Sequence, residues 1–289
     1  MYMIDRNIKI VVVILHYKSS DDTISCVNSI LNKNDSVINV VIVCNGSNDE
    51  SDEFIYNKYF NYDNVHVIVL AKNLGFACGM NVGIKYGKEI GARIIVCANN
   101  DVEFVQNDFF RILESKYFEN TFGVIGPDVI NLDNIHQNPT YIPKKIKKYA
   151  LNEYKKTING IKRCKYFKGV FEYIFCIIKK VFPKNIKNID KNSLLRLHGS
   201  CIIFGSEFLD VYNGFNDETF LYGEEEILTY MCFRKNISMQ YCSELKILHK
   251  EAKSTKIVYK NTIKRHLMFY ENYSQSLKIL LKLIENEDI

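Results

Sequence analysis

The sequence has few of the residues that interrupt regular structure. With 4 Pro and 14 Gly among 289 residues, a collagen-like or linker-rich protein is excluded. The 9 Cys form no CxxC pair, and several lie in or beside apolar stretches, which is typical of buried thiols in a reducing compartment. No apolar run approaches the roughly 20 residues that span a bilayer, and the start of the chain lacks a secretory signal pattern. We therefore expect a cytoplasmic protein, or one that lies on a membrane surface.

Basic residues are concentrated in one segment. The chain carries a formal charge of +5, but residues 144–191 hold 15 basic and 3 acidic side chains, which leaves −7 for the remainder. A charge run is most often a solvated face. Here the Lys blocks are interleaved with apolar residues at nearly helical spacing, which favours an interfacial helix on anionic lipid. No recognised nucleic-acid module surrounds the segment, so we expect no nucleic-acid partner. The apolar residues are Phe167, Phe171, Ile174, Phe175, Ile178 and Phe182.

The first half alternates short strands with helical patterns. Residues 8–15, 37–43, 65–70 and 93–98 are apolar, mostly β-branched runs that predict strands buried on both faces. Helical spacing falls between them, around residues 24–31 and 79–88. Alternation of this kind predicts an α/β fold with a Rossmann-like, mostly parallel central sheet and flanking helices. Ligands bind such sheets at the carboxyl ends of the strands.

The second half contains weaker signals. Residues 194–205 (LLRLHGSCIIFG) predict a strand, residues 224–226 open a helix, residues 245–248 predict a short strand that ends in His249, and residues 263–284 form an amphipathic helix. We therefore divide the chain into a nucleotide-binding half (1–131), a basic, partly helical insertion (132–194), a catalytic half (195–256) and a C-terminal helix (257–289).

Two polar clusters carry candidate chemistry. Asn99–Asn100–Asp101 follows a buried strand, where a carboxylate flanked by amides can hold a hard divalent cation, although such residues also satisfy turn backbone. Glu224–Glu225–Glu226 follows an aromatic stretch that can raise a carboxyl pKa towards that of a base, although acids are common in a first helical turn. Beside an Asp-bound cation, His249 becomes a credible imidazole ligand.

Seven short motifs occur in an order that resembles a known family. They are a strand followed by Tyr17, then IVCNGSND (42–49), AKNLGFACGMNVGI (71–84), NND (99–101), HGSCIIFGSEF (198–208), GFNDETFLYGEEE (214–226) and ILHKEAKST (247–255). Together they resemble the inverting family 2 glycosyltransferases of the GT-A fold, especially the rhamnosyltransferase-like branch that builds bacterial surface polysaccharides. The resemblance implies a Mn²⁺- or Mg²⁺-dependent transferase that moves a sugar from a nucleotide-diphospho-sugar to a glycan acceptor, often lipid-linked, at the cytoplasmic face of the inner membrane.

The resemblance also implies roles for individual residues. Glu225 would be the catalytic base with Glu224 beside it, and Asp101 and His249 would hold the metal. The acceptor side would include His198, Gly199 and Tyr222. The nucleotide-sugar would contact Tyr17, Cys44, Asn45, Ser47, Asn73, Phe76, Asn81, Asn99, Asn100 and Asp101.

This sequence departs from the family pattern at two of these positions. Cys44 stands where the family usually has an Asp that contacts the base, and Glu225 stands where it has an Asp. Glu226 adds a second candidate for the catalytic base.

Two other classes of function remain open from the sequence. A sugar-1-phosphate nucleotidyltransferase would share the layered fold and the metal, but it needs a glycine-rich, basic loop after the first strand. This chain has HYKSSDD there. A non-catalytic binding protein with a degenerate site is the second alternative.

Overall fold

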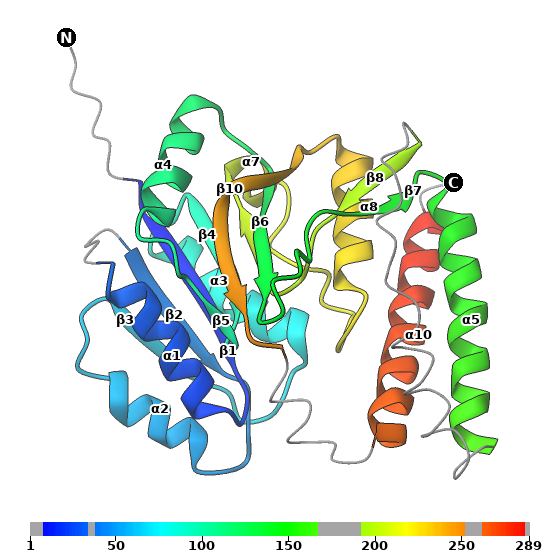
Figure 1. Ribbon diagram of the computed structural model, residues 1–289, viewed down its shortest axis with the longest axis horizontal. Helices are drawn as coiled ribbons and strands as arrows, with labels where there is room; N and C mark the ends of the chain where they lie inside the picture. Colours follow the sequence, from blue (N-terminus) through cyan, green and yellow to red (C-terminus); the bar gives the residue numbers. More distant parts are fainter. Residues whose placement is uncertain (1–7, 34–37, 167–191, 252–261, 287–289) are drawn as a thin grey trace.

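The computed structural model describes residues 8–33, 38–166, 192–251 and 262–286, and these form a layered α/β structure (Figure 1). Its main sheet has eight strands in the order β3-β2-β1-β4-β9-β6-β10-β5, and β7 and β8 form a separate two-stranded sheet. The strands are β1 Ile10–His16, β2 Ile38–Cys44, β3 Val65–Val69, β4 Ile94–Asn99, β5 Val102–Glu103, β6 Val124–Asn131, β7 Thr140–Pro143, β8 Ser193–Arg196, β9 Cys201–Phe204 and β10 Met239–His249. The helices are α1 Ser20–Leu31, α2 Ser51–Tyr59, α3 Phe76–Glu89, α4 Phe109–Glu119, α5 Ile146–Tyr166, α7 Ser206–Leu209, α8 Glu224–Lys235 and α10 Thr262–Asn286.

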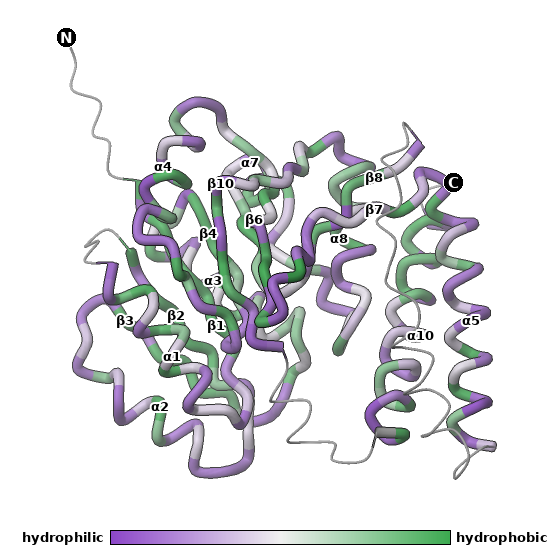
Figure 2. The backbone as a smooth tube through the Cα atoms, in the orientation of Figure 1, coloured by the Kyte–Doolittle hydropathy of each residue, from purple (hydrophilic) through white to green (hydrophobic). Residues whose placement is uncertain are grey.

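The first half has the architecture that the sequence predicts. β1 pairs in parallel with both β2 and β4, so Ile10 lies beside Ile38 on one side and Ile94 on the other. Residues of α1, α2 and α4 pack on one face of the sheet, and residues of α3, α7 and α8 pack on the other. The tube in Figure 2 shows the apolar strands lying between more polar helices. The carboxyl ends of β1, β2 and β4 therefore reach one edge of the sheet.

Helix α3 lies unusually close to this edge. A Cβ on Gly79 would lie 2.6 Å from Cδ1 of Leu15, and one on Gly83 would lie 2.3 Å from Cγ1 of Val13. The two glycines share one face of the helix, so they let the α3 backbone approach β1. This places the N-terminus of α3 beside the end of β2.

The expectation of one strand over residues 194–205 is wrong. The segment forms β8, which pairs with β7, and then β9, which enters the main sheet antiparallel to β4 and β6. The polar turn His198–Gly199–Ser200 separates the two strands. Because β9 runs antiparallel to β4, its first residues lie at the edge where β4 ends: Ala98 pairs with Cys201, and the Asn99 amide donates to the Ser200 carbonyl at 2.9 Å.

A third apolar cluster joins α5, α8 and α10. Ala150 of α5, Ile227 of α8 and Leu280 of α10 are buried together. Helices α5 and α10 lie side by side and antiparallel (Figure 1), because Lys147 pairs with Glu285 at 4.0 Å and Lys165 pairs with Glu271 at 3.6 Å. Within the described ranges, no helix combines the length and apolarity needed to cross a bilayer. The expected interfacial helix around Phe171–Phe182 lies outside the described residues.

Candidate active site

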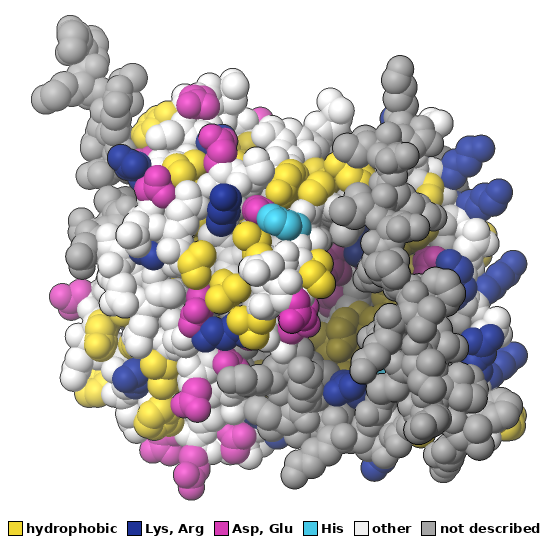
Figure 3. All heavy atoms as spheres, in the orientation of Figure 1, with side chains coloured by type: hydrophobic (Ala, Val, Ile, Leu, Met, Phe, Trp, Pro, Cys, Tyr) yellow, Lys and Arg dark blue, Asp and Glu magenta, His cyan; other side chains and the backbone are white. Residues whose placement is uncertain are grey.

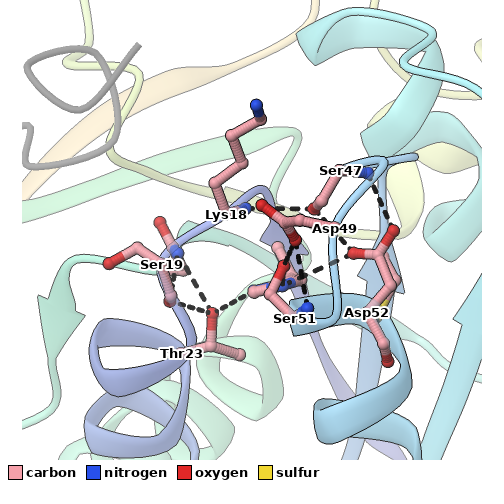
Figure 4. Close-up of polar contacts among 10 residues, drawn as sticks. Lys18, Ser19, Thr23, Ser47, Asp49, Ser51 and Asp52 are labelled. Atoms are coloured by element: carbon pink, nitrogen blue, oxygen red, sulfur yellow. Dashed lines mark hydrogen bonds and ion pairs between the residues drawn. The ribbon is translucent and has the colours of Figure 1, made fainter.

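Ser47, a predicted nucleotide-binding residue, is held in the loop after β2 by a buried carboxylate (Figure 4). Its amide and hydroxyl donate to the two carboxylate oxygens of Asp52 at 2.7 Å and 2.6 Å. Its hydroxyl oxygen also accepts the Lys18 amide at 3.0 Å. In Figure 4 the Lys18 ammonium points away from these bonds. The sequence interpretation identified neither Lys18 nor Asp52, and both belong to this loop cluster.

His16 ties the end of β1 to two helices. Its Nδ1 lies 2.7 Å from the Thr23 hydroxyl, and its Nε2 lies 3.2 Å from the Ser51 hydroxyl. Burial lowers the pKa of His16, although Asp52 and Asp49 act in the opposite direction. Because both ring nitrogens contact hydroxyl groups and the lowered pKa favours the neutral form, His16 positions the loops and does not supply a charge to a ligand.

Asn45 and Asn73 shape the loop that precedes α3. The Asn45 amide donates to the Asn73 side chain at 3.2 Å and to the Gly75 carbonyl at 3.0 Å, and its carbonyl oxygen accepts the Leu74 amide at 3.0 Å. Gly75 has φ +85°, and its Cβ would lie 2.4 Å from the Phe220 carbonyl oxygen. The Phe76 amide donates to that oxygen at 2.7 Å. Asn45 and Asn73 thus hold the loop before α3 in a conformation that contacts Phe220, in the segment that leads to α8.

The structure does not bring two of the predicted nucleotide-binding residues to this surface. Cys44 is fully buried in the core, where its thiol points towards the Asp52 carbonyl at 3.9 Å, and burial raises its pKa to about 12. A fully buried side chain at this place has no surface with which to contact a base. The amide of Asn81 is engaged with the Phe215 backbone at 2.8 Å and 2.9 Å. Tyr17, by contrast, is half-buried at the end of β1, with the Lys18 ammonium 5.5 Å from its ring.

The residues that follow β4 have two different roles: Asn100 stabilises the turn, and Asp101 belongs to the candidate site. The Asn100 amide donates to the Thr23 hydroxyl at 3.0 Å and the Ser19 carbonyl at 3.3 Å, which fixes the turn against α1. Asp101 is 6% exposed, and one of its carboxylate oxygens lies 3.5 Å from Nε2 of His249 at the end of β10. The two residues predicted to hold a metal are therefore adjacent.

Gln137 orients His249. Its side-chain oxygen lies 2.7 Å from Nδ1 of His249, and its amide donates to the Glu251 carboxylate at 3.0 Å. Because the amide group faces a carboxylate, the oxygen faces the imidazole, which fixes the proton on Nδ1. Nε2 of His249 then faces Asp101. Gln137 lies in a stretch of sequence without periodicity, so no local pattern points to it.

The turn before β9 connects the metal pair with the acidic start of α8. The rings of His198 and His249 lie 5.3 Å apart, edge to face. The next residue, Gly199, lies against the Glu225 carboxylate, and its backbone amide acts to lower the pKa of that group. A chain of contacts therefore leads from Asp101 through His249, His198 and Gly199 to Glu225. The ring of Tyr222, just before α8, lies 4.8 Å from that of Phe269 on α10.

The three consecutive glutamates have different surroundings. Glu226 is 2% exposed and lies 2.6 Å from Nη1 of Arg196 and 3.1 Å from the Tyr273 hydroxyl, so it holds α8, β8 and α10 together. Burial and the neighbouring Glu225 raise the pKa of Glu224 to about 8, so its charged form is disfavoured. Burial and Glu226 also raise the pKa of Glu225, against the Arg196 charge and the Gly199 amide. Glu225 is the half-buried one of the three.

A model of "Glycosyl transferase family 2" matches residues 11–204, two thirds of the chain. The chain belongs to this family. The match includes the loops after β1, β2 and β4 and the turn before β9, so the predicted family is confirmed.

Two curated relatives are named as glycosyltransferases. The "Low-salt glycan biosynthesis hexosyltransferase Agl10" of Haloferax volcanii is 22% identical over 83% of this chain and 66% of that protein. The "dTDP-rhamnosyl transferase RfbF" of Shigella flexneri is 32% identical over 39% of this chain and 36% of that protein. The matched stretch thus spans just under two thirds of the first relative and about a third of the second.

Solved structures confirm the predicted GT-A fold. The mannosyltransferase PcManGT from Pyrobaculum calidifontis, in complex with GDP-Man and Mn²⁺, superposes with a TM-score of 0.54 at 10% identity and covers 95% of this chain and 72% of its own. S. aureus TarS 1–349 in complex with UDP-GlcNAc gives 0.51 at 14% identity, with 86% of this chain and 60% of that one covered.

The donor atoms at the Asp101–His249 pair fit a divalent cation. A carboxylate oxygen and an imidazole nitrogen face each other, and the imidazole proton is held on the far side by Gln137. The described residues contain no group of three or more His, Cys, Asp or Glu in metal-binding geometry.

Proposed function

We propose that this protein is a metal-dependent, inverting glycosyltransferase that uses a nucleotide-diphospho-sugar as donor. The observation that carries the proposal is the continuity between the Asp101–His249 pair and Glu225, through His198 and Gly199. Family membership supports the reaction class. The Mn²⁺ and GDP-Man bound to the Pyrobaculum structure support the cofactor and the kind of donor.

The chain's own residues account for both halves of a single displacement. Asp101 and His249 would hold Mn²⁺ or Mg²⁺, which neutralises the charge that develops on the leaving diphosphate. Glu225 accepts the proton of the acceptor hydroxyl. The hydroxyl oxygen forms a bond to the anomeric carbon as the bond from that carbon to the diphosphate breaks. Attack opposite the leaving group inverts the configuration, and one carboxylate suffices because the diphosphate leaves as an anion and needs no proton from a general acid.

Among the three glutamates, the surroundings favour Glu225 as the base. Glu226 is occupied by Arg196 and Tyr273. Glu224 is buried, and burial and the neighbouring Glu225 raise its pKa to about 8, which disfavours its anion. Glu225 has a raised pKa, which suits proton abstraction, and its anion is stabilised by Arg196 and by the Gly199 amide.

For the acceptor we propose a glycan hydroxyl, lipid-linked, in the synthesis of a cell-surface polysaccharide such as capsule or O-antigen. The names of the relatives support this choice, since one is a glycan-biosynthesis hexosyltransferase and the other a rhamnosyl transferase. His198, Gly199 and Tyr222 would lie on the acceptor side. A lipid-linked acceptor would place the enzyme at the cytoplasmic face of the inner membrane.

The test compares Glu225→Gln with the unaltered chain. Donor binding is measured by thermal shift with Mn²⁺ and a panel of nucleoside diphosphates and nucleotide sugars, and turnover is measured as Mn²⁺-dependent transfer or donor hydrolysis. Gln keeps the size of the side chain but accepts no proton, so we expect turnover to fall roughly 10²–10⁴-fold with donor binding unchanged. Normal turnover by the variant would refute the role of Glu225. No nucleotide-sugar binding by either protein would refute the function.

A further inference from the structure

Helix α5 presents an outward face that is basic along its whole length. Its described side chains include seven exposed cations, and the one acid of the helix, Glu153, is half-buried and pairs with Lys156 at 2.6 Å. Figure 3 shows Lys and Arg side chains along the edge of the molecule that α5 forms. The cationic face consists of Lys147, Lys148, Lys155, Lys156, Lys162, Arg163 and Lys165.

The spacing of these cations produces a straight row. Lys148, Lys155 and Lys162 are seven residues apart, close to two helical turns, so they lie nearly in line over about 21 Å. The structure gives none of the three an ion pair within the described part of the chain. The opposite side of the helix is occupied, because Ile146, Ala150, Thr157 and Gly160 are buried against its neighbours.

Apolar side chains share this face with the cations. Leu151 and Tyr166 of α5 are 42% and 83% exposed, and Phe233 of α8 is 48% exposed. At the N-terminal end of α5, a cavity of about 530 Å³ has a lining that combines Lys144, Lys145 and Lys148 with Leu151, Phe233 and Ile284. Among the described residues that line this cavity, none is acidic.

We propose that the cationic face of α5, with the cavity at its N-terminal end, is a docking surface for an anionic lipid bilayer. A straight row of Lys with interspersed apolar residues matches the surface of a bilayer, which has phosphate groups at its surface and hydrocarbon beneath them. The methylene groups of each Lys can cover apolar surface while its ammonium group stays at the phosphates. Lys outnumbers Arg eight to one over residues 144–165. A nucleic-acid surface would favour Arg and stacked aromatic rings.

This inference rests on the proposed function in one respect, because a lipid-linked acceptor is met at a membrane. The experiment uses the full chain and vesicles of phosphatidylcholine alone or of equal parts phosphatidylcholine and phosphatidylglycerol. The test variant is Lys148→Glu/Lys155→Glu/Lys162→Glu. The control, Lys58→Glu/Lys85→Glu/Lys246→Glu, changes three exposed lysines on α2, α3 and β10 and alters net charge equally.

We expect the unaltered chain and the control to bind anionic vesicles, to ignore neutral ones and to be released by salt. The test variant should bind at least about a hundredfold more weakly, since each Lys near an anionic surface contributes roughly 1 kcal/mol. Equal losses in both variants, equal binding to neutral vesicles, or binding to duplex DNA but not to vesicles would overturn the proposal. Mn²⁺-dependent donor turnover without vesicles should be the same in all three proteins, so its absence would refute the proposed function and leave the vesicle result standing.

Discussion

A methyl group on Gly199 would lie 2.3 Å from Oε1 of Glu225, so the proposed base occupies the space that a side chain at position 199 would fill. The backbone amide of the same glycine acts to lower the pKa of Glu225. The absence of a side chain at one residue therefore sets the position of a functional group on another element. This relationship links the turn before β9 to the start of α8.

Gly199→Ala should displace the base without unfolding the protein. The atom that the new methyl meets is the end of a flexible side chain, which can rotate away. A displacement of about 1 Å at a reacting group can cost about 10²-fold in rate, so we expect a loss of that order in turnover. The melting temperature and donor binding should stay close to those of the unaltered chain. Normal turnover in Gly199→Ala would show that the position of Glu225 is not critical.

Gln137→Leu tests whether a hydrogen bond behind His249 tunes metal affinity. Leu has similar size but offers no acceptor to Nδ1, so the imidazole loses its fixed orientation towards Asp101. Such supporting bonds typically change metal affinity by about 10–100-fold. We expect Mn²⁺ binding, measured by calorimetry without donor, to weaken within that range. Asn272→Leu on α10, which removes a side-chain bond to the Met268 carbonyl, serves as the control. Equal Mn²⁺ affinities in Gln137→Leu and the unaltered chain would contradict the role of Gln137.

Much of this site was predictable from local sequence, and the rest depends on long-range contacts. β1, β2 and β4 are β-branched runs with polar residues after them, so the position of Asp101 at a sheet edge follows from the sequence. The direction of β9 does not, because the run CIIF has no feature that distinguishes a parallel strand from an antiparallel one. The separate roles of Glu224, Glu225 and Glu226 come from burial, from Gly199 and from Arg196 respectively, and each is set by tertiary packing.

Cys44→Asp tests whether residue 44 sets the preference for a nucleotide base or only packs in the hydrophobic core. The sequence resemblance predicts that Asp at this position changes the preference between uridine and thymidine diphosphates. The structure instead places the side chain in the core, where a carboxylate would be buried beside Asp52. We therefore expect Cys44→Asp to lower the free energy of unfolding by roughly 2–4 kcal/mol, and Cys44→Ala to lower it less. A stable Cys44→Asp with an altered nucleotide preference would restore the original interpretation.

Glu224 should make the protein less stable as the pH rises. Its pKa is about 8 in the folded protein, against an ordinary value of 4.5, because the side chain is buried beside Glu225. Between those two values the folded state retains a proton that the unfolded state has released, so the free energy of unfolding falls with rising pH and levels off above the folded pKa. Glu224→Gln removes this titration while keeping the shape of the side chain. Between about pH 6 and about pH 8.5, the free energy of unfolding measured with urea should therefore fall more in the unaltered chain than in the variant, by roughly 1–3 kcal/mol.

Glu53→Gln, which changes an exposed carboxylate on α2, serves as the control and should follow the unaltered chain. Equal losses in Glu224→Gln and the unaltered chain would show that Glu224 is ionised in the folded protein, and Glu224 would then compete with Glu225 for the role of base.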